Sequence, residues 1–133
     1  MNQTMGLEGS GVLGVGIDLV EVDRFAASLD RAPGLLDRLF TSAERSYANQ
    51  VADPTQRLAV RFAAKEATLK ALGVGLGACA FSQIEVVTLA SGQPRLELHD
   101  TASTLADDGG VGSWQVSLTH TASMAQAIVM ALR

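Results

Sequence analysis

The sequence is short of several features that would point to particular classes of protein. Its 133 residues include a single cysteine, Cys79, which excludes an internal disulfide and any zinc site built from several cysteines. Aromatic residues make up only 5% of the chain, so the core must consist mainly of Val, Leu, Ile and Ala. No apolar run approaches the ~18 residues of a membrane span, and the first residues lack the basic and apolar regions of a secretory signal. We therefore expect a cytoplasmic protein.

Positive charge is also scarce. The formal net charge is −4, and Lys65 and Lys70 are the only lysines. A domain that binds nucleic acid carries a basic surface, so we expect neither a nucleic-acid partner nor a membrane partner. Both lysines lie in one segment, residues 61–75, which therefore concentrates positive charge in a protein that is acidic overall.

That segment has the composition of a long helix, which we expect to start near Asp53 and to stop at Gly73. Asp53 is a good N-cap residue, and Pro54 suits the first helical position. Alanine is dense between residues 59 and 71, which favours helix throughout. Gly73 can adopt the positive φ that commonly follows a helix end.

The charges on this helix allow two interpretations. Glu66 and Lys70 are four residues apart and therefore share one side of the helix. Neighbouring alanines would let another backbone or a ligand come close to Glu66. The simpler alternative is an ordinary Glu–Lys pair on a solvated surface, which contributes little stability.

Residues 12–20 alternate as a β-strand. Small or polar residues, Gly14, Gly16 and Asp18, share one side, and apolar residues occupy the other. The glycines leave their side bare, so a neighbouring chain or a ligand can approach Asp18. A carboxylate near the end of an apolar strand conflicts with local propensity; its alternative role is to cap the helix that follows.

The remaining segments predict an α+β fold. We expect a helix at 22–29, another that the capping box Thr41-Ser-Ala-Glu44 opens and that runs toward Asn49, and a third at 101–106. A hairpin is expected from 83–89 and 94–98, and further strands at 114–121 and 125–132, the last one central. A small antiparallel sheet of about five strands would pack on the one long helix. Residues 11–133 would form a single domain after a flexible lead-in, residues 1–10.

Three fragments of the chain, taken in order, resemble the holo-acyl-carrier-protein synthase family of 4′-phosphopantetheinyl transferases. They are Gly16-Ile-Asp18 with Arg24 six residues on, the segment from Arg61 to Gly75 with Lys65-Glu66-Ala67 and Lys70-Ala71-Leu-Gly73, and Ser117-Leu-Thr-His120-Thr121. The turn Gly92-x-Pro94 also fits. The resemblance runs from about residue 12 to the C-terminus, and it depends on the order and spacing of the fragments more than on any one of them.

The resemblance implies a definite reaction. Enzymes of this family transfer the 4′-phosphopantetheine arm of coenzyme A to a serine hydroxyl of an apo acyl carrier protein, release adenosine 3′,5′-bisphosphate, and serve fatty acid biosynthesis. Their single-domain members are trimers with active sites at the subunit interfaces. By motif position, Asp18 and Glu66 would ligate Mg²⁺ and act in catalysis with Lys70, and Arg24 would face the acidic carrier. Coenzyme A would be bound by Arg61, Lys70, Gly73, Ser117, His120 and Thr121.

The residue types suit this chemistry. Phosphoryl transfer needs positioning and positive charge around the phosphate oxygens, and Mg²⁺ is commonly held by one or two carboxylates. Glu66 could also accept the serine proton, directly or through water. Two other hypotheses stay open: a Mg²⁺-dependent nucleotide or pyrophosphate hydrolase, and a non-catalytic subunit in which Asp18 and Glu66 are structural. His120 could instead be a core or interface histidine.

Overall fold

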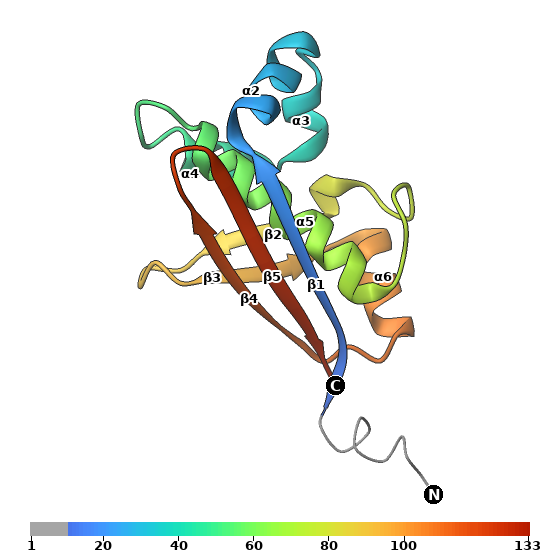
Figure 1. The fold of residues 1–133 in the computed structure, drawn as a ribbon. Coiled ribbons are helices and arrows are strands. Elements are labelled where there is room, and N and C mark those ends of the chain that lie inside the picture. The colour runs from blue at the N-terminus through green and yellow to red at the C-terminus, as the bar shows by residue number, and fades with distance from the viewer. Residues whose placement is uncertain (1–10) are drawn as a thin grey trace, which may run out of the picture.

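The computed structural model describes residues 11–133, so the predicted lead-in, residues 1–10, lies outside the described residues. The described chain has the predicted α+β character (Figure 1). Its elements are β1 (Val12–Glu21), α2 (Val22–Arg31), α3 (Leu35–Leu39), α4 (Ser42–Ala48), α5 (Thr55–Leu72), the 3₁₀ helix η1 (Phe81–Gln83), β2 (Ile84–Thr88), β3 (Pro94–Leu98), α6 (Asp100–Asp108), β4 (Ser113–His120) and β5 (Met124–Leu132). Within residues 11–133, no helix combines the length and the apolar character needed to cross a membrane.

The strands form two antiparallel sheets, whereas the sequence predicted one. The larger sheet has the order β1-β5-β4, and β2 pairs only with β3 in a separate hairpin. In Figure 1 the larger sheet stands in front and the hairpin crosses behind it. The central position predicted for the last strand is confirmed, because β5 pairs with both β1 and β4.

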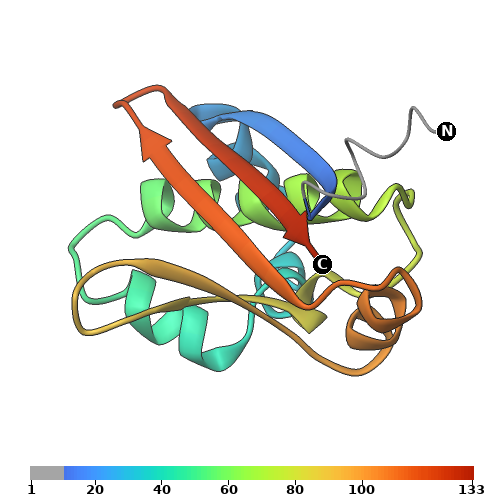
Figure 2. The ribbon, with the colours of Figure 1, turned by 90° about the horizontal axis from the view of Figure 1, so that it is seen from below.

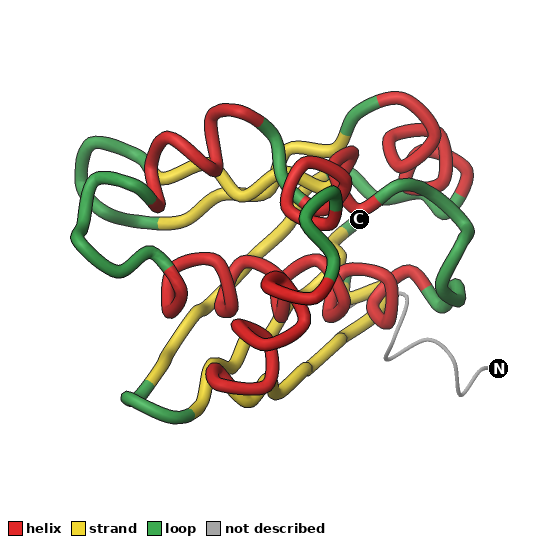
Figure 3. The backbone as a smooth tube through the Cα atoms, turned by 90° about the horizontal axis from the view of Figure 1, so that it is seen from above, coloured by secondary structure: helices red, strands yellow, loops and turns green. Residues whose placement is uncertain are grey.

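The long helix α5 lies between these two sheets, as the views from below and from above show (Figures 2 and 3). Its side chains are buried on nearly all sides, as expected of a helix enclosed by other elements. Both predicted ends are close to the observed ones. Asp53 Oδ1 accepts the N–H of Thr55 at 3.0 Å, and Gly73 follows the helix with φ 72°.

Strand β1 lies directly against α5 because two of its residues lack side chains. A Cβ atom on Gly16 would lie 1.8 Å from the carbonyl oxygen of Ala67, and one on Gly14 would lie 2.0 Å from that of Ala71. The bare side of the strand therefore faces α5 of the same chain. The expectation that a neighbouring chain would pack on these glycines is wrong.

The opposite side of the larger sheet carries the apolar side chains of β1. Val15, Ile17 and Leu19 are exposed there, and Ile17 lies across from the exposed Ile128 of β5. In the part of the chain that the structure describes, no element covers this side, which faces the viewer in Figure 1. We refer to these four side chains as the outer apolar face.

Candidate active site

Asp18 of β1 and Lys70 of α5 meet where the strand crosses the helix. The Lys70 ammonium donates hydrogen bonds to the carbonyl oxygen of Ile17 at 2.9 Å and to Asp18 Oδ1 at 3.2 Å. The Asp18 side chain is only 13% exposed. Asp18 does not cap the following helix, because α2 begins after Glu21 and has no side-chain cap. The structure therefore brings together the first and second predicted motifs.

Glu66 lies one helical turn before Lys70 and adjoins Asp18. Burial, and after it the negative charge of Asp18, raise the pKa of Glu66 to about 7, although Lys70 acts in the opposite direction. The surface Glu66–Lys70 ion pair considered as an alternative is not formed in the described structure, since Lys70 pairs with Asp18. Two carboxyl groups and one ammonium thus share a small, half-buried volume.

The carboxyl pair fits a hard divalent cation. Oδ2 of Asp18 is buried and has no hydrogen-bond partner among the described residues. Leaving a buried carboxylate oxygen without a donor is costly, and the second carboxyl beside it adds repulsion. A cation would remove both penalties. Mg²⁺ retains several waters and needs only one or two protein carboxylates, so Asp18 and Glu66 are a sufficient set of protein ligands.

Two open hollows adjoin Lys70. The first, of about 390 Å³, is lined by Ile17, Asp18, Leu19, Lys70 and Gln126. The second, of about 310 Å³, is lined by Glu66, Leu69, Lys70, Val74, Gly75 and Leu76. Because the segment that follows Gly73 bounds the second hollow, a ligand that reaches the carboxyl pair from this side contacts the loop after α5. Gly73 itself is not among the lining residues, so its contact with coenzyme A stays a prediction.

The third predicted motif lies elsewhere on the larger sheet. Ser117, His120 and Thr121 are all exposed, at β4 and the turn that follows it. Strand β5 separates β4 from β1, which corresponds to about 10 Å at the usual strand spacing. His120 is not a core histidine, because its side chain is exposed, and within residues 11–133 its imidazole makes no hydrogen bond. One chain by itself does not gather this motif around Asp18 and Glu66.

Arg61 is turned away from the carboxyl pair. Its guanidinium is buried, donates to Thr88 Oγ1 at 2.7 Å, and lies 4.4 Å from the centre of the Tyr47 ring. Burial lowers the pKa of Arg61, and these contacts within the chain occupy its charged group. The expectation that Arg61 binds coenzyme A is therefore not supported.

Lys65, the neighbour of Glu66 in the second motif, does not add positive charge beside the carboxyl pair. Its fully buried ammonium donates to Glu44 Oε1 at 2.8 Å, and to the carbonyl oxygens of Phe81, at 3.1 Å, and of Ile84. Glu44 Oε2 accepts the N–H of Val86 at 2.9 Å. The pair therefore joins α4, α5 and β2. Sequence reasoning recognised Glu44 only through its capping box, which the structure confirms.

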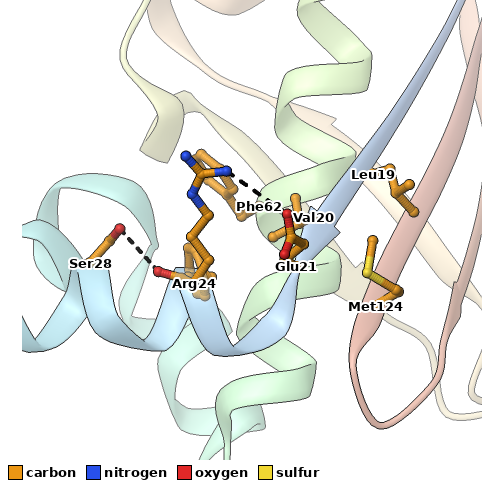
Figure 4. Close-up of a pocket in the computed structure, with 8 residues that line it drawn as sticks. Leu19, Val20, Glu21, Arg24, Ser28, Phe62 and Met124 are labelled. Atoms are coloured by element: carbon orange, nitrogen blue, oxygen red, sulfur yellow. Dashed lines mark hydrogen bonds and ion pairs between the residues drawn. The ribbon is translucent and has the colours of Figure 1, made fainter.

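Arg24 stands at the rim of a third hollow, of about 310 Å³, whose remaining lining is Leu19, Val20, Glu21, Phe25, Ser28, Phe62 and Met124. Its side chain is 82% exposed and lies 3.8 Å from Glu21. Figure 4 shows Arg24 and Glu21 on one side of the hollow and Leu19 and Met124 on the strands opposite. Sequence analysis identified the charged rim and missed the apolar lining, which comes from three separate segments.

Comparisons with known proteins identify the family of the chain. The sequence model of the 4′-phosphopantetheinyl transferase superfamily matches residues 14–126. The holo-[acyl-carrier-protein] synthase of Streptomyces avermitilis is 48% identical over 120 residues, which cover 90% of this chain and 97% of the relative. The crystal structure of the synthase from Neisseria meningitidis has a TM-score of 0.83 at 29% identity, with 92% and 99% of the two chains covered. The synthase from Bacillus anthracis, solved in complex with CoA (3′,5′-ADP), has a TM-score of 0.76 at 31% identity, with 91% and 96% covered.

The chain therefore belongs to the 4′-phosphopantetheinyl transferase superfamily. Its curated relatives of 44–48% identity are holo-[acyl-carrier-protein] synthases, so the chain is an enzyme of phosphopantetheinyl transfer. The family expected from the three sequence fragments is confirmed.

The raised pKa of Glu66 predicts a pH-dependent affinity for divalent cations. A cation competes with the proton on Glu66, so its affinity should fall about tenfold for each pH unit below the pKa of about 7 and level off above it. Titration with Mn²⁺, followed by electron paramagnetic resonance between about pH 5 and 8, measures this. Glu66→Gln should bind more weakly and with a flatter profile; a steep profile in this variant would mean that another group titrates.

The same pKa shift has a consequence for folding without a cation. The pKa of Glu66 rises from 4.5 to about 7 on folding, so the folded state favours the protonated carboxyl. The stability that this group contributes is fully present below pH 4.5 and is lost as the pH rises through about 7. A bound cation would restore it, because ionised Glu66 would then have a partner.

Proposed function

We propose that the chain transfers the 4′-phosphopantetheine group of coenzyme A to a serine hydroxyl of an apo acyl carrier protein and releases adenosine 3′,5′-bisphosphate, in a reaction that depends on Mg²⁺. The observation that carries the metal part is the pairing of Asp18 with Glu66, in which one buried carboxylate oxygen has no donor. Membership of the superfamily supports the transfer, and the related synthase in complex with CoA (3′,5′-ADP) supports the donor substrate.

The proposed roles follow from the geometry of the three charged groups. When bound by Asp18 and Glu66, Mg²⁺ would supply positive charge for the pyrophosphate oxygens of coenzyme A. Lys70 already holds its ammonium beside Asp18 at 3.2 Å, from where it would neutralise charge on the transferred phosphoryl group. Glu66 is the candidate to take the serine proton, directly or through water, because it is the carboxyl group that lines the second hollow beside Lys70.

We further propose that a second copy of the chain completes the site, within a homotrimer. Ser117, His120 and Thr121 would then bind coenzyme A from a neighbouring subunit, because in one chain they stand apart from Asp18 and Glu66. The outer apolar face supports self-association, since exposed apolar patches of this kind commonly mark interfaces. The side of β1 that carries Gly14 and Gly16 is covered by α5. The outer apolar face is therefore the side of this strand that remains for a partner.

Ile128→Asp is expected to dissociate the trimer, because it places a charge in the middle of the outer apolar face. Light scattering should give about three times 13.9 kDa for the wild type and about 13.9 kDa for the variant. Val51→Asp changes an exposed apolar residue outside this face and should leave the mass unchanged. A monomeric wild type at working concentration would contradict the assembly.

Arg24→Glu is expected to raise KM for the carrier about tenfold while leaving KM for coenzyme A nearly unchanged, because a charge at the rim of an interface steers and orients a charged partner. The exposed position of Arg24 on α2 motivates this assignment. Steady-state kinetics with each substrate varied in turn separates the two constants. Arg133→Glu makes the same charge change at the exposed C-terminus and serves as the control. Equal changes in both constants for Arg24→Glu would refute the docking role.

The proposed reaction is tested by the mass of an apo acyl carrier protein incubated with the chain, coenzyme A and Mg²⁺. Transfer should add about 340 Da, the mass of one phosphopantetheine group, and the addition should disappear with EDTA or when the acceptor serine is replaced by alanine. Consumption of coenzyme A without a change in carrier mass would instead indicate the hydrolase. No reaction with several carriers, in a folded sample, would indicate a non-catalytic protein.

A further inference from the structure

The β2–β3 hairpin carries a second group of metal-ligating side chains. Glu85 of β2 pairs directly with Glu97 of β3, and His99 follows two residues later, so all three lie on one side of the hairpin. One ligand atom from each residue lies within 4.8 Å of the other two. The hairpin and β1 lie on different sides of α5 (Figure 2), which separates this group from Asp18.

The charges in this group are unbalanced. Two glutamates directly opposite each other in adjacent strands repel. Arg95 contacts Glu97 Oε2 at 2.5 Å, and His99 Nε2 lies 2.9 Å from Glu85 Oε1. Arg95 therefore offsets only one of the two carboxylates, and a bound metal ion would supply the positive charge that the group lacks.

Glu85, one of the three ligands, is held in place by a residue that is not itself a ligand. Glu85 Oε2 accepts a hydrogen bond from Thr41 Oγ1 at 2.8 Å, which holds the carboxylate with Oε1 toward His99. Outer contacts of this kind fix the direction of metal ligands and are common around metal sites. Glu97 and His99 are 39% and 43% exposed, so a metal ion and its waters can reach the group.

We propose that Glu85, Glu97 and His99 bind a divalent transition-metal ion such as Zn²⁺ or Co²⁺, at a site independent of Asp18 and Glu66. One imidazole nitrogen with two carboxylate oxygens is a ligand set that zinc uses, whereas Mg²⁺ prefers oxygen alone. Ligand atoms at most 4.8 Å apart need to close in by less than about 1 Å each to reach zinc–ligand distances of ~2.0–2.2 Å.

Such an ion would cross-link elements of the fold that do not carry Asp18, Glu66 or Lys70. It would join β2 to β3 and, through Glu85 and Thr41, reach the N-terminus of α4. The site is therefore expected to raise thermal stability when occupied, and to leave Mg²⁺-dependent transfer unchanged when disrupted.

The chain contains only two histidines, His99 and His120, which makes the proposal directly testable. Two-dimensional NMR of the imidazole nitrogens of the untagged chain reports on both during a titration with Zn²⁺. The His99 signals should shift saturably while the exposed His120 signals do not. Glu97→Gln should weaken the binding at least about tenfold, since it removes one charged ligand, and Asp18→Asn should leave it intact.

Thermal unfolding supplies an independent readout. Asp18→Asn weakens the other cation site, so Tm is compared in that background: Zn²⁺ should raise Tm of Asp18→Asn and of Asp18→Asn/His120→Ala, and should have no such effect on Asp18→Asn/His99→Ala. The proposal is overturned if the His99 signals do not move, if both histidines respond alike, or if Glu97→Gln binds Zn²⁺ as tightly as the wild type. Because His99 takes no part in the proposed transfer, loss of the metal site and loss of the enzymatic function are distinguishable.

Discussion

Asp18→Asn is expected to lower the rate of phosphopantetheinyl transfer by at least about a hundredfold while the fold is retained. Asparagine has the same shape, and its side-chain oxygen can still accept a hydrogen bond from Lys70. What is lost is the negative charge that a cation requires. Single-turnover measurements at several Mg²⁺ concentrations would show whether excess metal recovers part of the rate.

Asp18→Asn should also change the pKa of the neighbouring Glu66, which a purely structural defect would not do. The Asp18 charge is one cause of the raised pKa of Glu66, so Asp18→Asn should lower that pKa, as followed by NMR of the Glu66 carboxyl carbon. Asp107→Asn, at an exposed position of α6, is the control for removing one carboxylate. Wild-type turnover in Asp18→Asn at saturating Mg²⁺ would exclude Asp18 from the site.

Gly16→Ala is expected to destabilise the fold by about 3 kcal/mol, at the upper end for an overpacked site. The new Cβ would lie 1.8 Å from the carbonyl oxygen and 2.7 Å from the carbonyl carbon of Ala67. These are backbone atoms in the middle of a buried helix, so they cannot rotate away as a side chain can. The strand and the helix would have to separate, which would also widen the gap between Asp18 and Lys70.

Urea unfolding followed by circular dichroism measures this effect, and Gly34→Ala is its control. Gly34 has φ −77°, and a Cβ atom there would meet no atom within 4 Å. Its replacement should change the free energy of unfolding by less than about 0.5 kcal/mol. If both variants were equally stable, the close packing of β1 on α5 would be disproved.

Much of the fold can be predicted from local patterns in this chain. Capping and composition place the long helix within two residues of its observed ends. Alternation finds β1 and β4, a β-rich segment with a turn finds the hairpin, and a nearly all-apolar run finds β5. Helix α3 was missed because five residues after a Pro-Gly break are too few to show a period. The division into two sheets was also missed, since alternation shows that a segment is a strand without showing which strand it pairs with.

The side chains of β1 show a second limit of sequence reasoning. Alternation correctly separates Gly16 and Asp18 from Ile17, but apolar residues ordinarily face the core, and here they face outward. The reason is tertiary: the glycines admit the backbone of α5, which then occupies the inner side. Lys65 and Glu66 are neighbours in the sequence, but their side chains do not belong to one charged cluster. A helix turns by about 100° per residue, which directs these neighbours into different layers.

The buried pair of Lys65 and Glu44 has a consequence for how the enzyme meets its substrates. It anchors the rear of α5 to α4 and β2, so the helix can neither roll about its axis nor slide along β1 without breaking a fully desolvated ion pair. Glu66 and Lys70 are therefore presented from an immobile support. If the carrier docks at Arg24, as proposed, carriers of different shape would have to be accommodated at this exposed rim, while Glu66 and Lys70 keep one fixed arrangement for every acceptor.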